Sequence, residues 1–455
     1  MEKHLSEMTL NELLNPEGIR CSCGKIHRCG LKYFKSKTGA VESVPEALEA
    51  LGKKKPFVVM DHNTKKAAGD LVCAVLDRAK IPYVPFVFPG TEKMEPDEYA
   101  VGSLIMAYDP SCDVILAVGS GVINDCCKVA AHAAHVPSMV VATAPSMDGY
   151  CSNSASMIQN HIKVSLYNAC PEAIVADTEI VRNAPDIMLK AGLGDMLAKY
   201  VSVCEWRISH EVHGDPYCEE IAELVRSSLK RVVDGADGLM RREPAAAEAV
   251  LEGLVISGIA MAFAEISRPA SGLEHYFSHL WEMQALQRSV PSDLHGIQVG
   301  VGTLLTLWIY ENILNNETVD IARAERVIPE FDQAKWKQDV REIFGPLADS
   351  IFEIEAKAKK NSPEGHAKRL AKIIDKWDYI REVIREELPE RQQILELMDR
   401  CKMPLYPSDL GISEADMRAA LRGSREIRDK YLTSSLLWDL GLLEDAIREL
   451  PYDIR

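Results

Sequence analysis

What the sequence lacks excludes several classes of protein. No stretch approaches the roughly 20 consecutive apolar residues that cross a bilayer, and the acidic, amphipathic N-terminus "MEKHLSEMTLNELLNPEG" is unlike a signal or transit peptide. Positive charge is scarce, because 52 Lys and Arg residues stand against 68 Asp and Glu residues and give a net charge of −16. This charge disfavours a nucleic-acid partner, although a local cation cluster would still bind a small anion. We therefore expect a cytoplasmic protein with no membrane insertion.

The composition is that of a globular protein, with 47% hydrophobic and 26% charged residues, and the length suits two or three domains. Its 12 cysteines are expected to be reduced. Eight of them are interpreted as small core residues, namely Cys73, Cys112, Cys126, Cys127, Cys151, Cys170, Cys204 and Cys218. The exception is "CSCGKIHRCG", where Cys21, Cys23, His27 and Cys29 are zinc-compatible but fit no common spacing. A turn-rich, reduced arm is favoured there over a second metal site.

The first 182 residues alternate short apolar runs with helical patterns. The runs at 56–60, 83–88, 113–119, 138–143 and 173–177 are rich in Val and Ile, which predicts a parallel sheet covered on both faces. The segments "SASMIQ" and "IKVSLYN", around Asn160 and His161, predict an antiparallel hairpin. From about residue 185 onward only helical periodicity is found, and Ser413 with Asp416 predicts a helix start. We expect a Rossmann-like α/β domain (1–182), an all-helical domain (183–455) and an active site in the cleft between them.

The segment "AVGSGVINDCCK" follows a predicted strand and opens a predicted helix. Gly119 and Gly121 would let the backbone turn sharply beside a pyrophosphate, although a plain strand-to-helix turn explains the pattern equally well. Asp61, directly after another strand, would accept hydrogen bonds from ribose hydroxyls. The loop at 142–156 is dense in small and hydroxyl residues, as ligand-lining loops are. Asp148 in that loop is a ligand contact or a turn residue.

Three of the 12 histidines lie close together in the sequence, in "SRPASGLEHYFSHLWEM" and "DLHGIQVG". His275 and His279 share a helix face, and His295 follows. Asp195, in "AGLGDMLAKY", is interpreted either as a residue at a helix start or as a fourth member of the group. One carboxylate and two imidazoles would bind a divalent cation and leave a position open for a substrate. The spacing does not decide whether His275 and His279 are both ligands or one contacts the substrate.

Five blocks together resemble a known family. "GSGVIND", "TAPSMDGYCS", "GLGDMLAK", "SRPASGLEHYFSH" and "LHGIQVGVGT" occur in the order and spacing of glycerol-1-phosphate dehydrogenases, most closely the bacterial AraM-type branch. That family is similar to glycerol dehydrogenase and the iron-containing alcohol dehydrogenases, within the dehydroquinate synthase-like fold. The glycine turn here is "GSG" where many relatives have "GGG". The resemblance implies binding of NAD(H), with NADP(H) possible, one divalent ion (zinc, nickel or iron) and a homodimer.

The resemblance also implies roles for individual residues. Asp195, His275 and His295 would bind the metal, while His279 and Asp148 would be catalytic and contact the substrate together with Asp195. Asp61 would favour NAD over NADP. The residues implied to bind the nucleotide are Asp61, Gly119, Ser120, Gly121, Val122, Ile123, Thr143, Ser146 and Ser152.

The implied reaction is reduction of dihydroxyacetone phosphate to sn-glycerol 1-phosphate. The substrate phosphate needs cations, and Lys199 and Arg268 are nearest in sequence to the metal residues, although such residues are often just solvated surface. The alternative within enzymes is a glycerol or other polyol dehydrogenase, with a dehydroquinate synthase less favoured. A catalytically silent nucleotide-binding or scaffolding protein is the alternative from another class, and the intact ligand set and glycine turn speak against it.

Overall fold

The structure, a computed structural model, describes residues 3–90, 94–160 and 162–453. It forms two compact units: unit 1 comprises Met1–Met196 and Cys218–Pro269, and unit 2 comprises Leu197–Tyr217 and Ala270–Arg455. The long helix α8 (Asp186–His213) contributes residues to both. In the described chain the last strand ends at Asp177, so the predicted change from α/β to helical structure is confirmed. The domain boundary near residue 182 stays a prediction, because the two compact units instead meet in the sequence after Met196, Tyr217 and Pro269.

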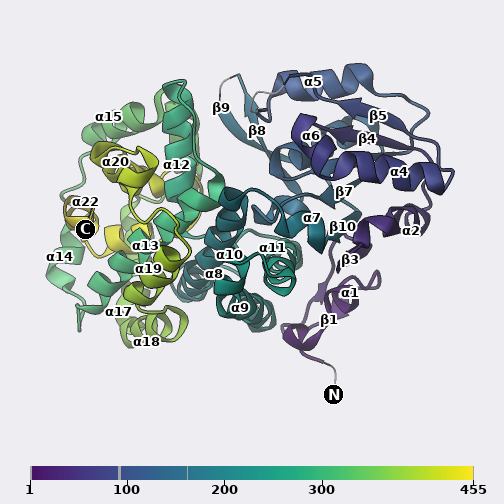
Figure 1. Cartoon of the computed structure of the whole chain (residues 1–455). Coiled ribbons are helices and arrows are strands. Elements are labelled where there is room, and N and C mark those ends of the chain that lie inside the picture. The colour runs from purple at the N-terminus through teal and green to yellow at the C-terminus, as the bar shows by residue number, and fades with distance from the viewer. Residues whose placement is uncertain (1–2, 91–93, 161, 454–455) are drawn as a thin grey trace. The chain divides into compact units, whose positions relative to one another are not determined.

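Unit 1 contains a six-stranded parallel sheet (Figure 1). Its strands, in spatial order, are β3 (Tyr33–Lys37), β10 (Ala173–Asp177), β7 (Ser138–Ala142), β6 (Val114–Gly119), β4 (Pro56–Met60) and β5 (Val84–Val87). Every residue of the four inner strands is buried, as expected for a sheet covered on both faces. The five predicted strands are therefore confirmed, and within this sheet only the edge strand β3 was not predicted.

Helices cover both faces of this sheet. On one face α2 (Val44–Ala50) and α4 (Asp70–Arg78) pack on alternate strand residues such as Leu116 and Val141. Helices α5 (Glu98–Ala107) and α6 (Gly121–Ala134) pack together and cover the other face. The predicted hairpin is present as β8 (Ser154–Gln159) and β9 (Ile162–Tyr167), which pair antiparallel; His161 lies outside the described residues.

The part of unit 1 that follows the sheet in the sequence is helical. After the sheet come α7 (Thr178–Arg182), the first part of α8, α9 (Glu219–Asp234), α10 (Ala236–Met240) and α11 (Pro244–Ala264). Near the N-terminus, the short strands β1 (Ile19–Arg20) and β2 (Ile26–His27) form an antiparallel hairpin. The strands β1 and β2 were not predicted, because two residues are too few to show any periodicity.

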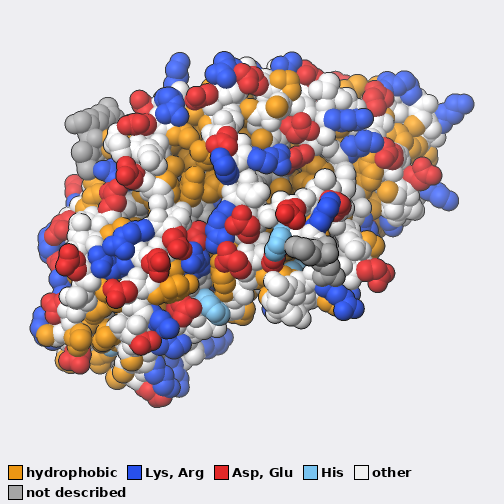
Figure 2. Space-filling model, turned by 90° about the horizontal axis from the view of Figure 1, so that it is seen from below, with side chains coloured by type: hydrophobic (Ala, Val, Ile, Leu, Met, Phe, Trp, Pro, Cys, Tyr) orange, Lys and Arg blue, Asp and Glu red, His pale blue; other side chains and the backbone are white. Residues whose placement is uncertain are grey.

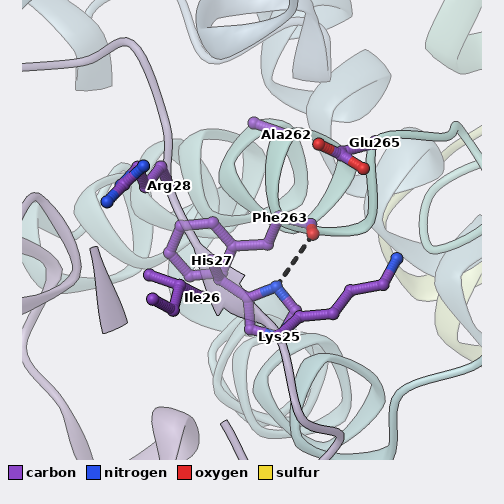
Figure 3. Close-up of a pocket in the computed structure, with 7 residues that line it drawn as sticks. All are labelled: Lys25, Ile26, His27, Arg28, Ala262, Phe263 and Glu265. Atoms are coloured by element: carbon purple, nitrogen blue, oxygen red, sulfur yellow. Dashed lines mark hydrogen bonds between the residues drawn. The ribbon is translucent and has the colours of Figure 1, made fainter. Parts of the chain in front are cut away.

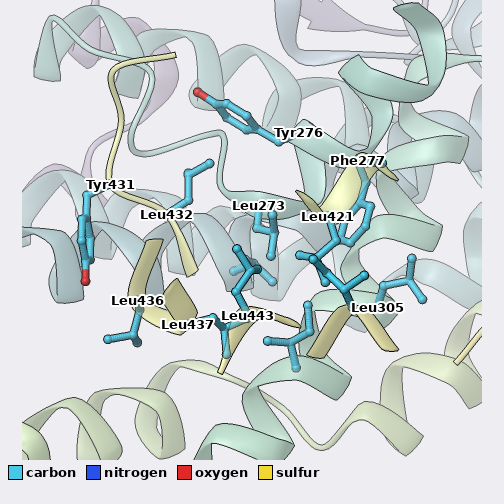
Figure 4. Packing of buried hydrophobic residues seen from close by; sticks show 14 of the residues in the cluster. Leu273, Tyr276, Phe277, Leu305, Leu421, Tyr431, Leu432, Leu436, Leu437 and Leu443 are labelled. Atoms are coloured by element: carbon cyan, nitrogen blue, oxygen red, sulfur yellow. The ribbon is translucent and has the colours of Figure 1, made fainter. Parts of the chain in front are cut away.

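Unit 2 is all-helical. Figure 4 shows its core, in which Leu273 and Phe277 of α12 (Leu273–Gln287) lie near Leu305 of α13 (His295–Leu314) and Leu421 of α20 (Glu414–Ser424). The predicted helix start at Ser413 is confirmed, because its hydroxyl accepts the Asp416 N–H at 3.1 Å. The remaining helices are α14 (Ile321–Arg326), α15 (Gln333–Phe344), α16 (Ala348–Ala358), α17 (Pro363–Asp375), α18 (Trp377–Glu387), α19 (Arg391–Arg400), α21 (Thr433–Asp439) and α22 (Leu443–Glu449).

Two helices correct the expectation that no segment is apolar enough to cross a bilayer. Helix α11 has 21 residues with a mean hydropathy of 1.7, and α13 has 20 residues with a mean hydropathy of 1.2. By length and composition alone, both qualify. The most apolar windows of α11 and α13 are, however, 72% and 78% buried within the protein. A helix that is hydrophobic on all sides is typical of the core of a large protein as well as of a membrane.

Charged side chains of both signs are interspersed on the face shown in Figure 2. Wherever they lie on the surface, charged side chains often pair locally, as Lys230 does with Asp234 at 2.7 Å and Arg226 with Glu219 at 2.6 Å. Exposed ion pairs of this kind each contribute about 0–1 kcal/mol. Such pairs therefore contribute little to the stability of the chain compared with its buried hydrophobic residues.

Candidate active site

The strand order of unit 1 marks where a ligand would bind. The chain passes from β4 outward to the edge strand β5, and then returns to β6 on the other side of β4. Ligands of open α/β sheets bind beyond the carboxyl ends of the strands at such a reversal. Asp61 follows β4 and Gly119 ends β6, so both lie at the reversal. The predicted strand–turn–helix context of the glycine turn is confirmed, with Ser120 as N-cap of α6.

The loop after β7 is fastened to this turn by hydrogen bonds. The Thr143 N–H donates to the Gly119 carbonyl at 3.1 Å, and the Ser146 and Ser120 hydroxyls are 2.6 Å apart. The buried Tyr150 hydroxyl donates to the Ala144 carbonyl at 2.6 Å. These bonds hold the predicted nucleotide residues of β6, α6 and the loop as one cluster.

A buried lysine that was not predicted supports the far end of the same loop. Lys128 of α6 is 1% exposed, and its ammonium donates to the carbonyls of Gly149 at 3.1 Å and Ser154 at 2.5 Å. It also pairs with Asp125 at 2.8 Å. Ser152 lies between Gly149 and Ser154 in the sequence, and its hydroxyl is 2.8 Å from the Ser154 hydroxyl. The amphipathic pattern of α6 gave no sign that this cation would be buried.

The other nucleotide-binding predictions have local structural roles as well. Asp61 is the N-cap of α3 (His62–Thr64), and its Oδ1 accepts the Thr64 N–H at 2.7 Å. Its Oδ2 takes no part in that bond. Ile123 is buried and Val122 half-buried in the first turn of α6. Because helix N-termini carry unpaired N–H groups, this turn suits a phosphate.

Asp148 and Asp195 lie side by side in unit 1. The Asp148 N–H donates to Asp195 Oδ2 at 2.9 Å, and the Ser257 hydroxyl donates to Asp148 Oδ2 at 2.9 Å. The interpretation of Asp195 as a residue at a helix start is wrong, because it lies in the middle of α8 and is fully buried. The glycines before it permit close packing instead: a Cβ on Gly192 would lie 1.8 Å from the Pro145 carbonyl oxygen.

The three predicted histidines come together in unit 2. His275 and His279 lie on α12, and His295 is the first residue of α13. The ring centroid of His295 is 5.3 Å from that of His275 and 5.5 Å from that of His279. The helices approach closely at Gly302, where a Cβ would lie 2.5 Å from the Glu274 carbonyl oxygen. The predicted clustering is therefore observed.

Glu282, one turn beyond His279, was not predicted to be near the site. Its carboxylate oxygens lie 3.5 Å from His295 Nδ1 and 3.8 Å from His279 Nδ1. These three residues present ligand atoms within 4.8 Å of one another, a spacing suited to one cation. The i, i+3 spacing of His279 and Glu282 on a helix was the signal that could have identified this acid.

Neighbouring polar groups orient two of the imidazoles. Glu274 Oε1 lies 2.8 Å from His275 Nδ1, and the Ser278 hydroxyl lies 2.9 Å from His295 Nδ1. Carboxylate and hydroxyl partners of this kind orient metal-bound histidines in proteins. Glu274 is fully buried, and its Oε2 has no hydrogen-bond partner among the described residues. A buried carboxylate beside the His275 imidazole fits a divalent cation.

The two predicted phosphate-binding cations are buried, so the interpretation as solvated surface is wrong. Lys199 on α8 is 1% exposed, and its ammonium donates to the Ala270 carbonyl at 3.0 Å. Arg268 in unit 1 is 4% exposed. A buried cation requires polar partners.

Comparison with known proteins shows which proteins share this fold. Residues 35–185 match the family described as iron-containing alcohol dehydrogenase. A glycerol dehydrogenase structure from Schizosaccharomyces pombe aligns with a TM-score of 0.61 at 16% identity, covering 92% of this chain and 90% of its own. The fold is thus that of the iron-containing alcohol dehydrogenase class.

Closer relatives are similar in sequence along most of their length. A glycerol-1-phosphate dehydrogenase [NAD(P)+] of Bacillus velezensis is 35% identical over 277 residues, which is 60% of this chain and 70% of the relative. One of Halalkalibacterium halodurans is 29% identical over 413 residues, covering 90% of this chain and 93% of the relative. The chain belongs to the glycerol-1-phosphate dehydrogenase family.

Proposed function

We propose that the chain is a metal-dependent NAD(H) oxidoreductase that interconverts dihydroxyacetone phosphate and sn-glycerol 1-phosphate. Family membership supports the reaction. The observation that carries the proposal is the cluster of three imidazoles on α12 and α13, with Glu274 Oε1 2.8 Å from His275 Nδ1 and the Ser278 hydroxyl 2.9 Å from His295 Nδ1. NADP(H) is an alternative cofactor, in keeping with the NAD(P)+ in the relatives' names.

We propose that Asp195, His275 and His295 bind the divalent ion. Their nitrogen and oxygen donors suit zinc, nickel or iron. When bound, the ion would polarise the ketone oxygen while the reduced nicotinamide supplies hydride to the ketone carbon. Glu274 and Ser278 would hold the two rings in position, and Glu282 is a further acid available to the same cation.

The chain itself has to deliver a proton to the substrate oxygen. We propose His279 for this step, because imidazole titrates near neutral pH and its side chain is 32% exposed, whereas that of His275 is only 5% exposed. Asp148 would contact the substrate hydroxyls, with its carboxylate oriented by the Ser257 hydroxyl. Both groups would then act on the substrate directly.

Substrate phosphate and nucleotide would bind to other parts of the chain. We propose Lys199 or Arg268 as the phosphate contact. The N-terminus of α6, from Gly119 to Ile123, would bind the pyrophosphate, while Thr143, Ser146 and Ser152 would line the nicotinamide side. Asp61 would bind the ribose, since its Oδ2 is not used in capping α3. We also propose a cytoplasmic location, which the composition and N-terminal sequence favour, and a homodimer, which the resemblance implies.

The decisive experiment compares two substrates. NADH oxidation is measured with dihydroxyacetone phosphate and with dihydroxyacetone, before and after chelation, and again after zinc or nickel is restored. We expect activity with the phosphorylated ketone that is lost on chelation and recovered with metal. Equal activity with dihydroxyacetone would instead identify a polyol dehydrogenase. One of the two cations, Lys199 or Arg268, is proposed to contact the phosphate. Charge reversal of that residue should raise KM for dihydroxyacetone phosphate and leave KM for dihydroxyacetone unchanged.

A further inference from the structure

A second cluster of metal-ligand side chains lies in unit 1, and the proposed reaction does not use it. It consists of Cys21, Cys23, His27 and Cys218, whose ligand atoms all lie within 4.8 Å of one another. The sequence places Cys218 almost 200 residues from the others. The earlier interpretation of Cys218 as a core residue is therefore incomplete, and Cys29, predicted as a possible ligand, is not a member.

Distances within the cluster match a tetrahedron around a single ion. The sulfurs of Cys21 and Cys218 are 3.5 Å apart, and His27 Nε2 lies 3.4 Å from the Cys23 sulfur and 3.7 Å from that of Cys218. Zinc binds sulfur at about 2.3 Å and nitrogen at about 2.0 Å, which separates tetrahedral ligands by roughly 3.5–3.8 Å. The sulfurs of a disulfide would be about 2.05 Å apart.

The imidazole is oriented as a ligand. Figure 3 shows His27 Nδ1 directed at the Phe263 carbonyl oxygen, 2.9 Å away at the end of α11. A carbonyl accepts a hydrogen bond, so Nδ1 carries the proton and Nε2 presents its lone pair to the three sulfurs. His27 is 2% exposed and stacks on the Phe263 ring at 5.5 Å. The ring cannot easily turn away from the cluster.

The backbone also supports the cluster. Cys21 and Cys23 lie in the turn between β1 and β2, which is closed by the Cys21 N–H donating to the Lys25 carbonyl at 3.0 Å. Cys218 is the N-cap residue of α9, so its sulfur lies at the start of that helix.

We propose that Cys21, Cys23, His27 and Cys218 form a structural zinc site, separate from the ion of the proposed reaction. Four protein ligands leave no open position, as in structural rather than catalytic zinc sites. The ion would join the β1–β2 hairpin to the start of α9, with His27 also bonded to the end of α11. Elsewhere the N-terminal segment is held by the Leu5 N–H, which donates to the Glu220 carboxylate at 3.1 Å, and by the burial of Leu5 and Leu13. The metal would therefore order residues 19–28.

Cobalt substitution distinguishes the two proposed ions, because only this site contains sulfur. The chelated full-length chain is titrated with Co²⁺ under reducing conditions. We expect two equivalents to bind, one of which gives the near-ultraviolet thiolate-to-cobalt absorption. Cys218→Ser should weaken that band, and Cys21→Ser combined with Cys218→Ser should lose it together with one equivalent. His27→Ala keeps the three thiols and should bind this Co²⁺ more weakly. Cys29→Ser is the matched control and should keep both. His295→Ala should lose the other equivalent of Co²⁺ and keep the thiolate band. The zinc site can therefore be tested even if the proposed reaction is not observed.

Two results would overturn the zinc site. One is the absence of a thiolate band in the wild-type chain, which requires no variant to fold. The other is a Cys21–Cys218 disulfide in peptide maps of protein prepared under reducing conditions. X-ray absorption of the zinc form provides an independent measurement, with three sulfur neighbours at about 2.3 Å and one nitrogen at about 2.0 Å expected.

Discussion

Two histidines one helical turn apart have different surroundings, and this suggests different roles. His275 is buried against the Glu274 carboxylate, whereas the His279 side chain is about one-third exposed. A metal ligand benefits from a fixed ring, while a proton relay needs access to substrate. The spacing of His275 and His279 in the sequence did not decide which of them binds the metal and which contacts the substrate. The difference in burial supports the assignment that the family resemblance implies.

Replacing His279 tests its role as proton relay. His279→Ala should lower kcat by about 10²–10⁴-fold, the usual contribution of a general acid, while metal content stays unchanged. Steady-state kinetics and elemental analysis provide the measurement. His132→Ala, on the exposed side of α6, is the control. Loss of metal from His279→Ala would identify His279 as a ligand instead.

Replacing Glu274 tests how far the ligands are held by their neighbours. Glu274→Gln retains an oxygen that accepts from His275 Nδ1 but removes the negative charge. We expect metal affinity to fall about 10–100-fold, with kcat largely retained at saturating metal. Competition with a chelator measures the affinity. An unchanged affinity would show that Glu274 only packs in the core.

At the residue scale, the members of the site were predictable where local sequence brings them together. His275, His279 and His295 lie within 21 positions and were identified from their spacing. Glu282 was missed because acids on helices are common, and Cys218 because only the fold brings it to Cys21. The residue types could not reveal that Lys128 and Lys199 are buried, since burial of a cation depends on carbonyls from distant segments.

At the element scale, apolar strands and amphipathic helices were identified from the sequence, and elements without such patterns were not. Strand β3 was missed because its sequence, YFKSK, is polar and lies at a sheet edge. The region "AGLGD" was expected to start a helix, but it lies inside α8, which is 28 residues long. Glycine disfavours a helix locally, yet tertiary packing outweighs that preference.

The close approach of α8 to the loop after β7 requires a glycine at position 192. Gly192→Ala would place its Cβ against the Pro145 carbonyl, so we expect a loss of about 1–3 kcal/mol in unfolding free energy, together with a raised KM for NADH as the loop shifts. Gly102→Ala in α5 is the matched control, because nothing lies within 4 Å of its Cβ. Denaturant titration should show Gly102→Ala unchanged or slightly stabilised. Equal stability of the two variants would contradict the packing argument.

An ion pair between α12 and α20 should make stability depend on pH. Bonding to the Arg288 guanidinium lowers the pKa of Asp416, so the stabilisation is present above about pH 4, the unfolded value, and is lost as pH falls through the folded value. Arg288 is 57% exposed, which limits the effect to about 1 kcal/mol. The difference in unfolding free energy between wild type and Arg288→Gln should shrink below pH 4. Arg385→Gln, an exposed control, should show no such dependence.

At the scale of the whole molecule, neither compact unit is a continuous piece of chain. Helices α9 and α11 belong to unit 1 although they follow part of unit 2 in sequence. Fragment 1–182 would therefore lack Ser257, which bonds Asp148, and the whole of α11, which packs on the 148–151 turn. We expect it to be protease-sensitive, whereas fragment 1–270 should be more resistant. Limited proteolysis measures this, and equal resistance would support a domain boundary near residue 182.

The order of synthesis has a bearing on the two apolar helices. Each would be recognisable to the membrane-insertion machinery as it leaves the ribosome, because both are long and hydrophobic on all sides. Yet α11 packs on α9, and α13 on α12, and in each pair the covering helix is translated first. The helix that covers each apolar helix is therefore already synthesised when the apolar helix emerges. The nascent chain can bury the apolar helix against it before a translocon or a chaperone binds that helix.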